Sequence, residues 1–341
     1  MDRLTRDTSP SERPLAVVAF GGNALLQPED RGTVAEQLRR ADAAAEWLAG
    51  LVERGWRLLI VHGNGPQVGQ AMIQMEAAVD KVPPGSLDVA VAETQGSMGY
   101  LLELALRNRF AREGLDAEPV CLLSQVVVDA DDPGFDDPTK PVGPFFSAER
   151  ARIFEQEHGW TMREEEHGWR KVVSSPRPLE ILGLQGVRDL LGGRRVVISG
   201  GGGGIPVARE NGTFHGIEAV IDKDRTAALL ARELEADLFL ILTNVAQVKR
   251  DFGTDREQSL PLLGVDEARE LLEAGQFPPG SMGPKMEAAV DFVAATGRRV
   301  VITDIGHVHQ AVDGEAGTTI VRRTERDEAE PEETESEAAP A

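Results

Sequence analysis

The sequence has little that could cross-link it or hold it in a membrane. Cys121 is the only cysteine among 341 residues, which excludes an internal disulfide and a cysteine-based metal cluster. No apolar run approaches the ~20 residues that a membrane-spanning helix needs. Residues 1–14 also lack the apolar segment of a secretory signal. We therefore expect a cytoplasmic protein without a membrane partner, working in a reducing compartment.

Basic residues are scarce, and lysine is the scarcer of the two. The chain has 57 acidic and 36 basic residues, which gives a net charge of −21. This excess argues against a nucleic-acid partner, because affinity for a phosphate backbone comes from lysine and arginine. An acidic, lysine-poor surface is typical of adaptation to high salt, where screening reduces self-repulsion; an ordinary acidic protein with an arginine-rich composition is the alternative. The six lysines are Lys81, Lys140, Lys171, Lys223, Lys249 and Lys285.

Short apolar stretches alternate with amphipathic ones along most of the chain. The stretches that we predict as strands are residues 15–20, 57–62, 119–123, 194–199, 238–243 and 298–304. Between them, segments such as 34–55 and 99–114 show helical periodicity. Strands that are apolar throughout and separated by amphipathic helices indicate a mainly parallel sheet covered on both faces. We therefore predict an α/β fold, a three-layer αβα sandwich.

Three segments depart from this alternation. Residues 1–13 and 325–341 are predicted to be disordered tails, and the second carries eight acidic residues and one arginine. Residues 129–175 are rich in proline and aspartate, and a connection of this length is typical of a lid or a small subdomain. We interpret the two copies of EHGW, at 157–160 and 166–169, as hairpin or turn chemistry, with coincidence equally open.

Glycine-rich turns follow three of the predicted strands. In an open α/β sheet, ligands bind at the carboxyl ends of the strands, and glycines there let backbone N–H groups converge on an anion. None of the turns is a P-loop or a GxGxxG fingerprint. The alternative for the run of five glycines is a flexible connector. The residues concerned are Gly21, Gly22 and Asn23; Gly63 and Asn64; and Gly200, Gly201, Gly202, Gly203 and Gly204.

Two of the six lysines stand at the start of a predicted helix, which is the end that disfavours a cation. Lys223 lies between Asp222 and Asp224, and Lys285 follows a turn of glycine and proline. A bound phosphate would explain both lysines, with the neighbouring carboxylates holding their side chains. The alternative is a solvated helix cap, with Asp222 or Asp224 as the capping residue.

These motifs together resemble the carbamate kinases of the amino acid kinase superfamily, over about residues 15–322. The similar strings are GGNAL at 21–25, HGNGPQVG at 62–69, QVVVDADDPGFDDPTKPVG at 125–143, SGGGGGIPV at 199–207, EAVIDKD at 218–224, LTNV at 242–245, FGT at 252–254 and GSMGPKMEAAVDFV at 280–293. Most kinases of the superfamily carry a lysine on the first strand, in K-x-G-G, where this chain has Ala19. Carbamate kinases likewise lack it and supply a lysine from a protruding subdomain, which corresponds here to Lys140.

The resemblance implies reversible phosphoryl transfer between ATP and carbamate, in arginine or agmatine breakdown. Carbamate is already an anionic nucleophile, so catalysis would consist of positioning and charge neutralisation without a general base. Mg²⁺ would arrive with ATP, held mostly by phosphate oxygens and water, with no metal site of the protein. The resemblance also implies a homodimer. The expected units are an N-terminal carbamate-binding lobe, 14–193, with its subdomain at about 129–175, and a nucleotide-binding lobe, 194–324.

Site residues follow from the same resemblance. Carbamate and the transferred phosphoryl would lie among Gly21, Gly22, Asn23, Gly63 and Asn64. Lys140 would reach them from the subdomain, Lys223 and Lys285 would flank the β- and γ-phosphates, and Asp222 would orient the lysines. The nucleotide would be bound by Gly200, Gly201, Gly202, Gly203, Gly204, Lys223, Thr243, Met282 and Lys285.

The chain departs from the family pattern at Ala246, where L-T-x-V-D-x-V has aspartate. Ala246 therefore keeps a non-catalytic ligand-binding paralogue as an alternative. A kinase for another small carboxylate is a second alternative, against which the absence of a lysine at Ala19 argues. His307 and His309 are spaced as a metal pair, but we interpret them as surface residues because no third ligand is evident. His62 is interpreted as a hydrogen-bonding residue of its turn and not as a base.

Overall fold

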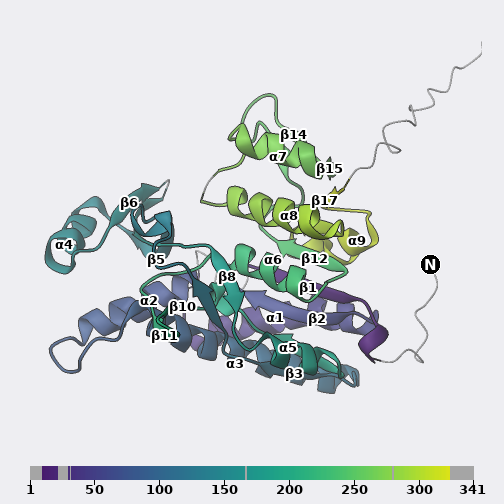
Figure 1. The fold of residues 1–341 in the computed structure, drawn as a ribbon, viewed down its shortest axis with the longest axis horizontal. Helices are drawn as coiled ribbons and strands as arrows, with labels where there is room; N and C mark the ends of the chain where they lie inside the picture. The colour runs from purple at the N-terminus through teal and green to yellow at the C-terminus, as the bar shows by residue number, and fades with distance from the viewer. Residues whose placement is uncertain (1–9, 22–29, 31, 166, 279, 323–341) are drawn as a thin grey trace, which may run out of the picture.

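A mainly parallel sheet forms the centre of the molecule in the computed structural model, which describes residues 10–21, 30, 32–165, 167–278 and 280–322 (Figure 1). In this described part, eight strands pair in the order β15, β17, β16, β12, β1, β2, β9, β3. Neighbouring strands are parallel except β16 and β17. In that order they span Leu262–Gly264, Thr318–Val321, Arg299–Thr303, Leu238–Leu242, Leu15–Phe20, Arg57–His62, Arg195–Ile198 and Glu118–Cys121.

Helices cover both faces of this sheet, because successive residues of its apolar strands point to opposite sides. Val17 of β1 faces a core shared with α5, α6, α7 and α8, whereas Val18 faces a core shared with α1, α3 and α9. The first layer comprises α5 (Leu184–Leu191), α6 (Lys223–Glu233), α7 (Val265–Glu273) and α8 (Met282–Thr296). The second comprises α1 (Val34–Glu53), α3 (Leu87–Glu113) and α9 (Val308–Asp313). The predicted three-layer α/β fold is confirmed.

A second sheet extends the body beside α3 and α5. Its strands pair in the order β11, β10, β4, β8; β10 runs parallel to β4, and the outer two strands are antiparallel to their neighbours. Val126 of β4 and Ile181 of β8 join the core that lies under α6. The four strands span Thr213–Gly216, Ile205–Glu210, Gln125–Val128 and Pro178–Ile181.

A small unit projects from the body at the left of Figure 1 and lies within the segment 129–175. It consists of an antiparallel sheet in the order β5 (Lys140–Phe146), β7 (Gly168–Val173), β6 (Met162–Glu165), with α4 (Ala148–His158) against it. Its own apolar cluster includes Phe154 and Trp160, whose stacked rings have centroids 4.5 Å apart. We call this unit the subdomain.

The subdomain packs on α2 (Gly65–Ala77), the helix that follows β2. Val68 of α2 shares an apolar cluster with Val142 of β5. A Cβ on Gly69 would overlap the backbone of Gly143, so the helix and the strand touch through their main chains. The start of β5 is thereby held beside the turn between β2 and α2.

The remaining elements are short. The first EHGW copy ends α4, where Gly159 adopts a left-handed conformation, and His167 of the second lies at the turn from β6 to β7, in agreement with the interpretation as turn chemistry. A two-stranded hairpin joins β13 and β14. The bounds not yet given are η1 (Pro10–Glu12), η3 (Pro133–Phe135), η4 (Gly201–Gly203), η5 (Ile305–His307), β13 (Lys249–Arg250) and β14 (Gln258–Ser259).

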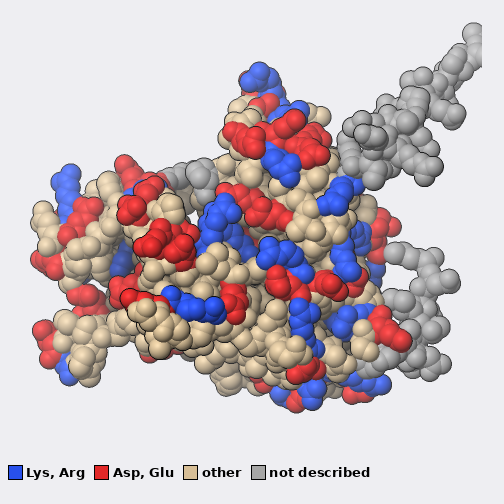
Figure 2. All heavy atoms as spheres, viewed as in Figure 1, with Lys and Arg blue, Asp and Glu red and all other residues tan. Residues whose placement is uncertain are grey.

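The surface carries charge of both signs. On the face shown in Figure 2, aspartate and glutamate side chains lie on every part of the molecule and are interspersed with lysine and arginine. Within the described residues, none of the helices is both long enough and apolar enough to span a bilayer.

Candidate active site

Three parallel strands of the main sheet end side by side. Phe20, the last residue of β1, pairs with the last residues of both β2 and β12. Gly21, Gly63 and Thr243 therefore leave the sheet next to one another, because the carboxyl ends of parallel neighbours meet at one edge. This edge is where the sequence predicts ligand binding.

Three lysines and two aspartates form an ion-pair cluster at this edge. Lys140, the first residue of β5, donates to Oδ2 of Asp222. The Nζ atoms of Lys223 and Lys285 each lie 2.8 Å from Oδ2 of Asp224. Their side chains are only 11% and 12% exposed, so the cluster is enclosed by the protein. With three cations and two anions, it retains one positive charge for a ligand.

Helix capping explains why two carboxylates stand among these lysines. Asp222 is the N-cap of α6, and its Oδ1 accepts from the backbone N–H of Asp224 at 2.8 Å. Such a cap satisfies a helix donor that has no partner within the helix. The other oxygen of Asp222 remains available to Lys140, which approaches from the subdomain.

Burial and charge compete in setting the pKa values of the cluster. Burial raises the pKa of the Asp222 carboxyl, but the charges of Lys140 and Lys223 outweigh it and hold that pKa far below its usual range. Burial likewise acts on Asp224, whose pKa is nevertheless lowered by Lys223 and Lys285. For Lys285, burial lowers the pKa and Asp224 offsets only part of that effect. For Lys223, the two aspartates overcome burial and raise the pKa. Both carboxyls are therefore ionised at neutral pH.

Two cavities meet at this cluster. The larger, about 500 Å³, is lined by all five charged residues together with Gly21, Thr243 and Ser281. The smaller, about 200 Å³, is lined by Gly63, Asn64 and Gly202. Lys140, Lys223 and Gly21 line both cavities, so these residues stand at the junction between them.

A third cavity, also of about 200 Å³, adjoins the larger one through Thr243, Asn244 and Ser281, which line both. Its remaining wall is mostly apolar and includes the side chains of Phe252 and Met282. Ala246 lies in the same loop as its lining residues, and its side chain is exposed.

The five successive glycines are buried and closely packed. A Cβ on Gly202 would overlap the side chain of Asn64, and one on Gly203 would overlap the carbonyl oxygen of Ile221. Both glycines also have positive φ angles, of 65° and 95°. The run is therefore not a flexible connector, because close packing against the β2–α2 turn and the start of α6 requires glycine here.

The polar residues of the β2–α2 turn are held by hydrogen bonds. Nδ2 of Asn64 donates to Oγ1 of Thr94 at 2.9 Å, and the His62 ring bonds the carbonyl oxygen of Gly63 at 3.2 Å. Burial lowers the pKa of His62 to about 4, against a smaller opposing effect of the Gly63 carbonyl. The interpretation of His62 as a hydrogen-bonding turn residue agrees with this geometry.

The structure thus brings together most of the residues that the sequence singles out. Lys140, Asp222, Lys223 and Lys285 share one cluster, with Gly21, Gly63, Asn64 and Thr243 around it and Met282 in the adjoining cavity. Gly22 and Asn23 lie outside the described residues.

The glycine run borders the smaller cavity. Of its members, Gly202 lines the smaller cavity, and none of the five lines the larger cavity. Gly203 and Gly204 donate their backbone N–H groups to the carbonyls of Gly200 and Gly201, at 3.0 Å each. The packing of the run lets the surrounding turns approach. The nucleotide contact that the resemblance implies for these glycines stays a prediction.

Some lining residues were not among the predicted site residues. Arg40, in the middle of α1, lines the larger cavity, as do Asn244 and Ser281. Phe252 lines the apolar one. Each of these four side chains reaches its cavity only in the folded protein. Arg40 is the one charged residue among them.

No group of three or more His, Cys, Asp or Glu side chains able to hold a metal ion occurs among the described residues. Asp222 and Asp224 are the carboxylates among the described residues that line the larger cavity, and both are paired with lysines. His307 is exposed and contacts Asp304 at 2.8 Å. The donor set therefore fits a metal ion that is carried by a phosphate ligand better than one held by the protein itself.

Comparison with known proteins places this arrangement in a family. Residues 14–304 match the amino acid kinase family. A carbamate kinase of Pyrococcus horikoshii is 40% identical over 307 residues, which cover 89% of this chain and 98% of that protein. The chain belongs to the carbamate kinases of the amino acid kinase family.

Further relatives agree with this membership. A carbamate kinase of Halobacterium salinarum is 43% identical over 307 residues, covering 89% of this chain and 97% of that carbamate kinase. The solved structure of carbamate kinase from Giardia lamblia bound to AMP-PNP is 37% identical, with a TM-score of 0.84, and covers 92% of this chain and all of that one. The likeness to the carbamate kinases therefore extends over the body and the subdomain.

Proposed function

We propose that this protein catalyses reversible phosphoryl transfer, from carbamoyl phosphate to ADP to give carbamate and ATP, and in reverse. The observation that carries the proposal is the place of Lys140. β1 has Ala19 where most amino acid kinases have a lysine, and Lys140 enters from the subdomain at the junction of the two cavities. Membership of the carbamate kinases and the AMP-PNP-bound relative support the choice of substrates.

The cavities suggest a division of the site. The smaller cavity, with Gly63, Asn64 and Gly202, would hold carbamate or carbamoyl phosphate, and the larger would hold the phosphates of the nucleotide. The apolar cavity with Phe252 and Met282 would take the base. The lobes would then be 14–193 with its subdomain for carbamate, and 194–324 for the nucleotide. Gly22 and Asn23 are proposed to complete the first turn.

In the reverse direction, a carbamate oxygen attacks the γ-phosphorus, the bond to the β–γ bridging oxygen breaks, and ADP leaves with that electron pair. Because carbamate is already anionic, no proton has to be removed from it. Lys140, Lys223 and Lys285 would stabilise charge on the transferring group, and Asp222 and Asp224 would hold the lysines in place. His62 is unsuited to be a base, since it is buried and bonded to Gly63.

Magnesium fits this scheme as a partner of the nucleotide. The charge of Mg²⁺ bound with the nucleotide would offset part of the negative charge of the phosphates. Ser281 and Thr243 line the larger cavity and would orient the waters around it.

The decisive experiment measures ATP formation from ADP and carbamoyl phosphate with purified protein and Mg²⁺. We expect activity that depends on all three components, assayed from dilute buffer to multimolar salt. Absence of activity at every salt concentration would overturn the proposal. A parallel panel with ATP and other small carboxylates tests whether the protein is a kinase for another substrate. Faster turnover of acetylglutamate than of carbamate would favour that alternative. Calorimetry that finds no ADP binding would favour the non-catalytic alternative.

We also propose a homodimer in the cytoplasm that tolerates high salt and serves arginine or agmatine breakdown. The charge of −21 with only six lysines supports the salt adaptation. The edge strand β3 and the adjoining α3 support an interface, because Tyr100 and Leu123 there are each 62% exposed. A monomeric mass by light scattering at both low and high salt would exclude the dimer.

A further inference from the structure

The relative position of two helices determines the geometry of the phosphate-binding lysines. Lys223 is the first residue of α6, and Lys285 lies in the first turn of α8. Both side chains converge on one oxygen of Asp224, at 2.8 Å each. If α8 slid along α6 by even a fraction of a turn, the two ammonium groups would no longer face the same ligand.

The contact through Asp224 is poorly suited to prevent such a shift during turnover. Under the proposed function, Lys223 and Lys285 donate to phosphate, and each donor given to a phosphate oxygen is withdrawn from Asp224. Oδ1 of Asp224 has no hydrogen-bond partner within the described part of the chain, so there it offers no second connection between the helices. A link outside the cavity would keep the two helix ends aligned.

Such a link exists on the opposite side of the two helices. Arg225 and Glu287 each stand two residues after a site lysine, which places them about 200° around their helices from it. Nε and Nη2 of Arg225 lie 3.1 and 2.7 Å from Oε2 of Glu287. Their side chains are 22% and 31% exposed, so the pair is partly shielded from solvent. A guanidinium that gives two N–H groups to one carboxylate fixes orientation as well as distance.

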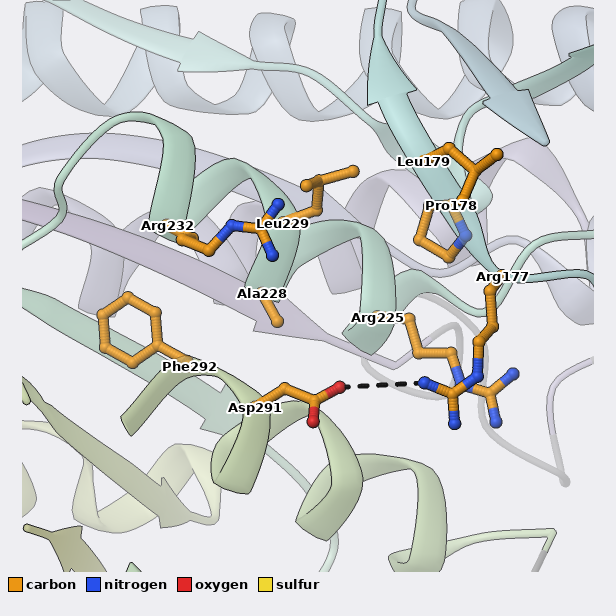
Figure 3. Close-up of a pocket in the computed structure, with 9 residues that line it drawn as sticks. All are labelled: Arg177, Pro178, Leu179, Arg225, Ala228, Leu229, Arg232, Asp291 and Phe292. Atoms are coloured by element: carbon orange, nitrogen blue, oxygen red, sulfur yellow. Dashed lines mark ion pairs between the residues drawn. The ribbon is translucent and has the colours of Figure 1, made fainter. Parts of the chain in front are cut away.

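The subdomain is tied to the same carboxylate. Arg177 lies 4.0 Å from Glu287 and 3.9 Å from Asp291 of α8. Its backbone N–H donates to Oδ2 of Asp132 at 2.9 Å, which joins the two chain segments leading into and out of the subdomain. Figure 3 shows the guanidinium groups of Arg177 and Arg225 directed toward α8, at a cavity of about 200 Å³ between α6, α8 and the start of β8.

We propose that Arg225 and Glu287 are positioning residues that keep Lys223 and Lys285 in register for the β-phosphate of the nucleotide. This inference rests on the proposed nucleotide site. Neither residue lines the three cavities of the proposed site, so the loss of the pair acts through the lysines. Binding of ADP should therefore suffer, whereas binding of AMP, which has no β-phosphate, should not.

The test compares Arg225→Gln, Glu287→Gln and the double variant by calorimetry with ADP and with AMP. We expect each single variant to bind ADP about fivefold more weakly than wild type. The double variant should bind ADP no more weakly than either single variant, because the two residues act as one unit. AMP affinity should stay within about twofold of wild type. Arg232→Gln is the matched control, because Arg232 lies on α6 and lines the cavity of Figure 3 but pairs with the exposed Glu233.

Charge reversal separates alignment from packing. Arg225→Glu should lower the affinity for ADP further. Adding Glu287→Arg should restore the affinity for ADP to within about threefold of wild type. Equal losses for ADP and AMP, multiplying losses in the double variant, or failure of this rescue would overturn the proposal. A wild type that binds ADP but makes no ATP from carbamoyl phosphate refutes the proposed function, while the ADP and AMP comparison still decides the role of the pair. A wild type that does not bind ADP refutes both.

Discussion

Replacing Lys140 by alanine tests the central feature of the site. The Lys140 ammonium is paired with Asp222 and lines both cavities, so it is the cation best placed for a group passing between them. A unit charge about 4 Å from a phosphoryl charge is worth about 4 kcal/mol at an effective dielectric constant of about 20. Because the Lys140 side chain is 27% exposed, we reduce this to about 3 kcal/mol, or about two decades in rate.

The assay is steady-state ATP formation with carbamoyl phosphate varied at saturating ADP. We expect Lys140→Ala to lower kcat/KM for carbamoyl phosphate about a hundredfold. ADP affinity by calorimetry should change by less than about threefold, because Lys223 and Lys285 remain on the nucleotide side. Lys81→Ala, at an exposed position after α2, is the matched control and should behave as wild type.

The outcome that refutes the reasoning is equally definite. If Lys140→Ala keeps kcat/KM within twofold of wild type, Lys140 does not contact the transferring phosphoryl group, and its pairing with Asp222 is structural only. Another cation would then have to serve, and the arginines of the subdomain would be examined first.

Three further predictions concern folding and pH. Gly203→Ala should lower the free energy of unfolding by about 3 kcal/mol or more, because its Cβ would overlap the Ile221 carbonyl. The control Gly212→Ala has a positive φ but open space around it and should cost about 1 kcal/mol. Equal losses of unfolding free energy for the two variants in urea would contradict this. The pKa of His62 in the folded protein, about 4, lies below its value in the unfolded chain. As pH falls from 6.5 to 4, the free energy of unfolding of wild type should therefore fall by up to about 3 kcal/mol relative to His62→Gln. Parallel curves of stability against pH would refute this prediction. Burial lowers the pKa of Lys171 to about 8, so wild type should gain about 1–3 kcal/mol relative to Lys171→Met as pH rises from 8 to 10.5, and a flat difference would count against it.

The strands of the main sheet show which features of a sheet can be predicted from local sequence pattern. The apolar stretches at 15–20 and 57–62 predict β1 and β2 to the residue, because a strand buried on both faces has no polar interruption. The same criterion missed β4 and β10, and it did not show that β17 runs antiparallel to β16. Pairing direction and strand order depend on contacts between segments far apart in the chain.

Prediction of the site residues from local sequence was limited in the same way. Lysines at helix starts were conspicuous because a cation there is unfavourable without an anionic partner, and both such lysines lie in the cluster. Lys140 was found by resemblance, since nothing in its local sequence indicates that it meets Asp222, 82 residues further along the chain. Arg40 was not found, and Phe252 lies in the similar string FGT but was not predicted as a site residue, because their cavities are formed by segments far apart in the chain.

By itself, the sequence determined the fold class, and it predicted the edge of the sheet at which an anionic ligand would bind. Apolar periodicity, glycine after a strand and charge at a helix end are local properties that depend on a few neighbouring residues. Only the tertiary structure decided what these features contact. It packed Gly202 against Asn64 and Gly203 against Ile221, brought three lysines onto two carboxylates, and joined α6 to α8 through Arg225 and Glu287. Most of these contacts join residues far apart in the chain, such as Lys140 and Asp222, 82 positions apart, and Arg225 and Glu287, 62 positions apart, so only folding brings them together.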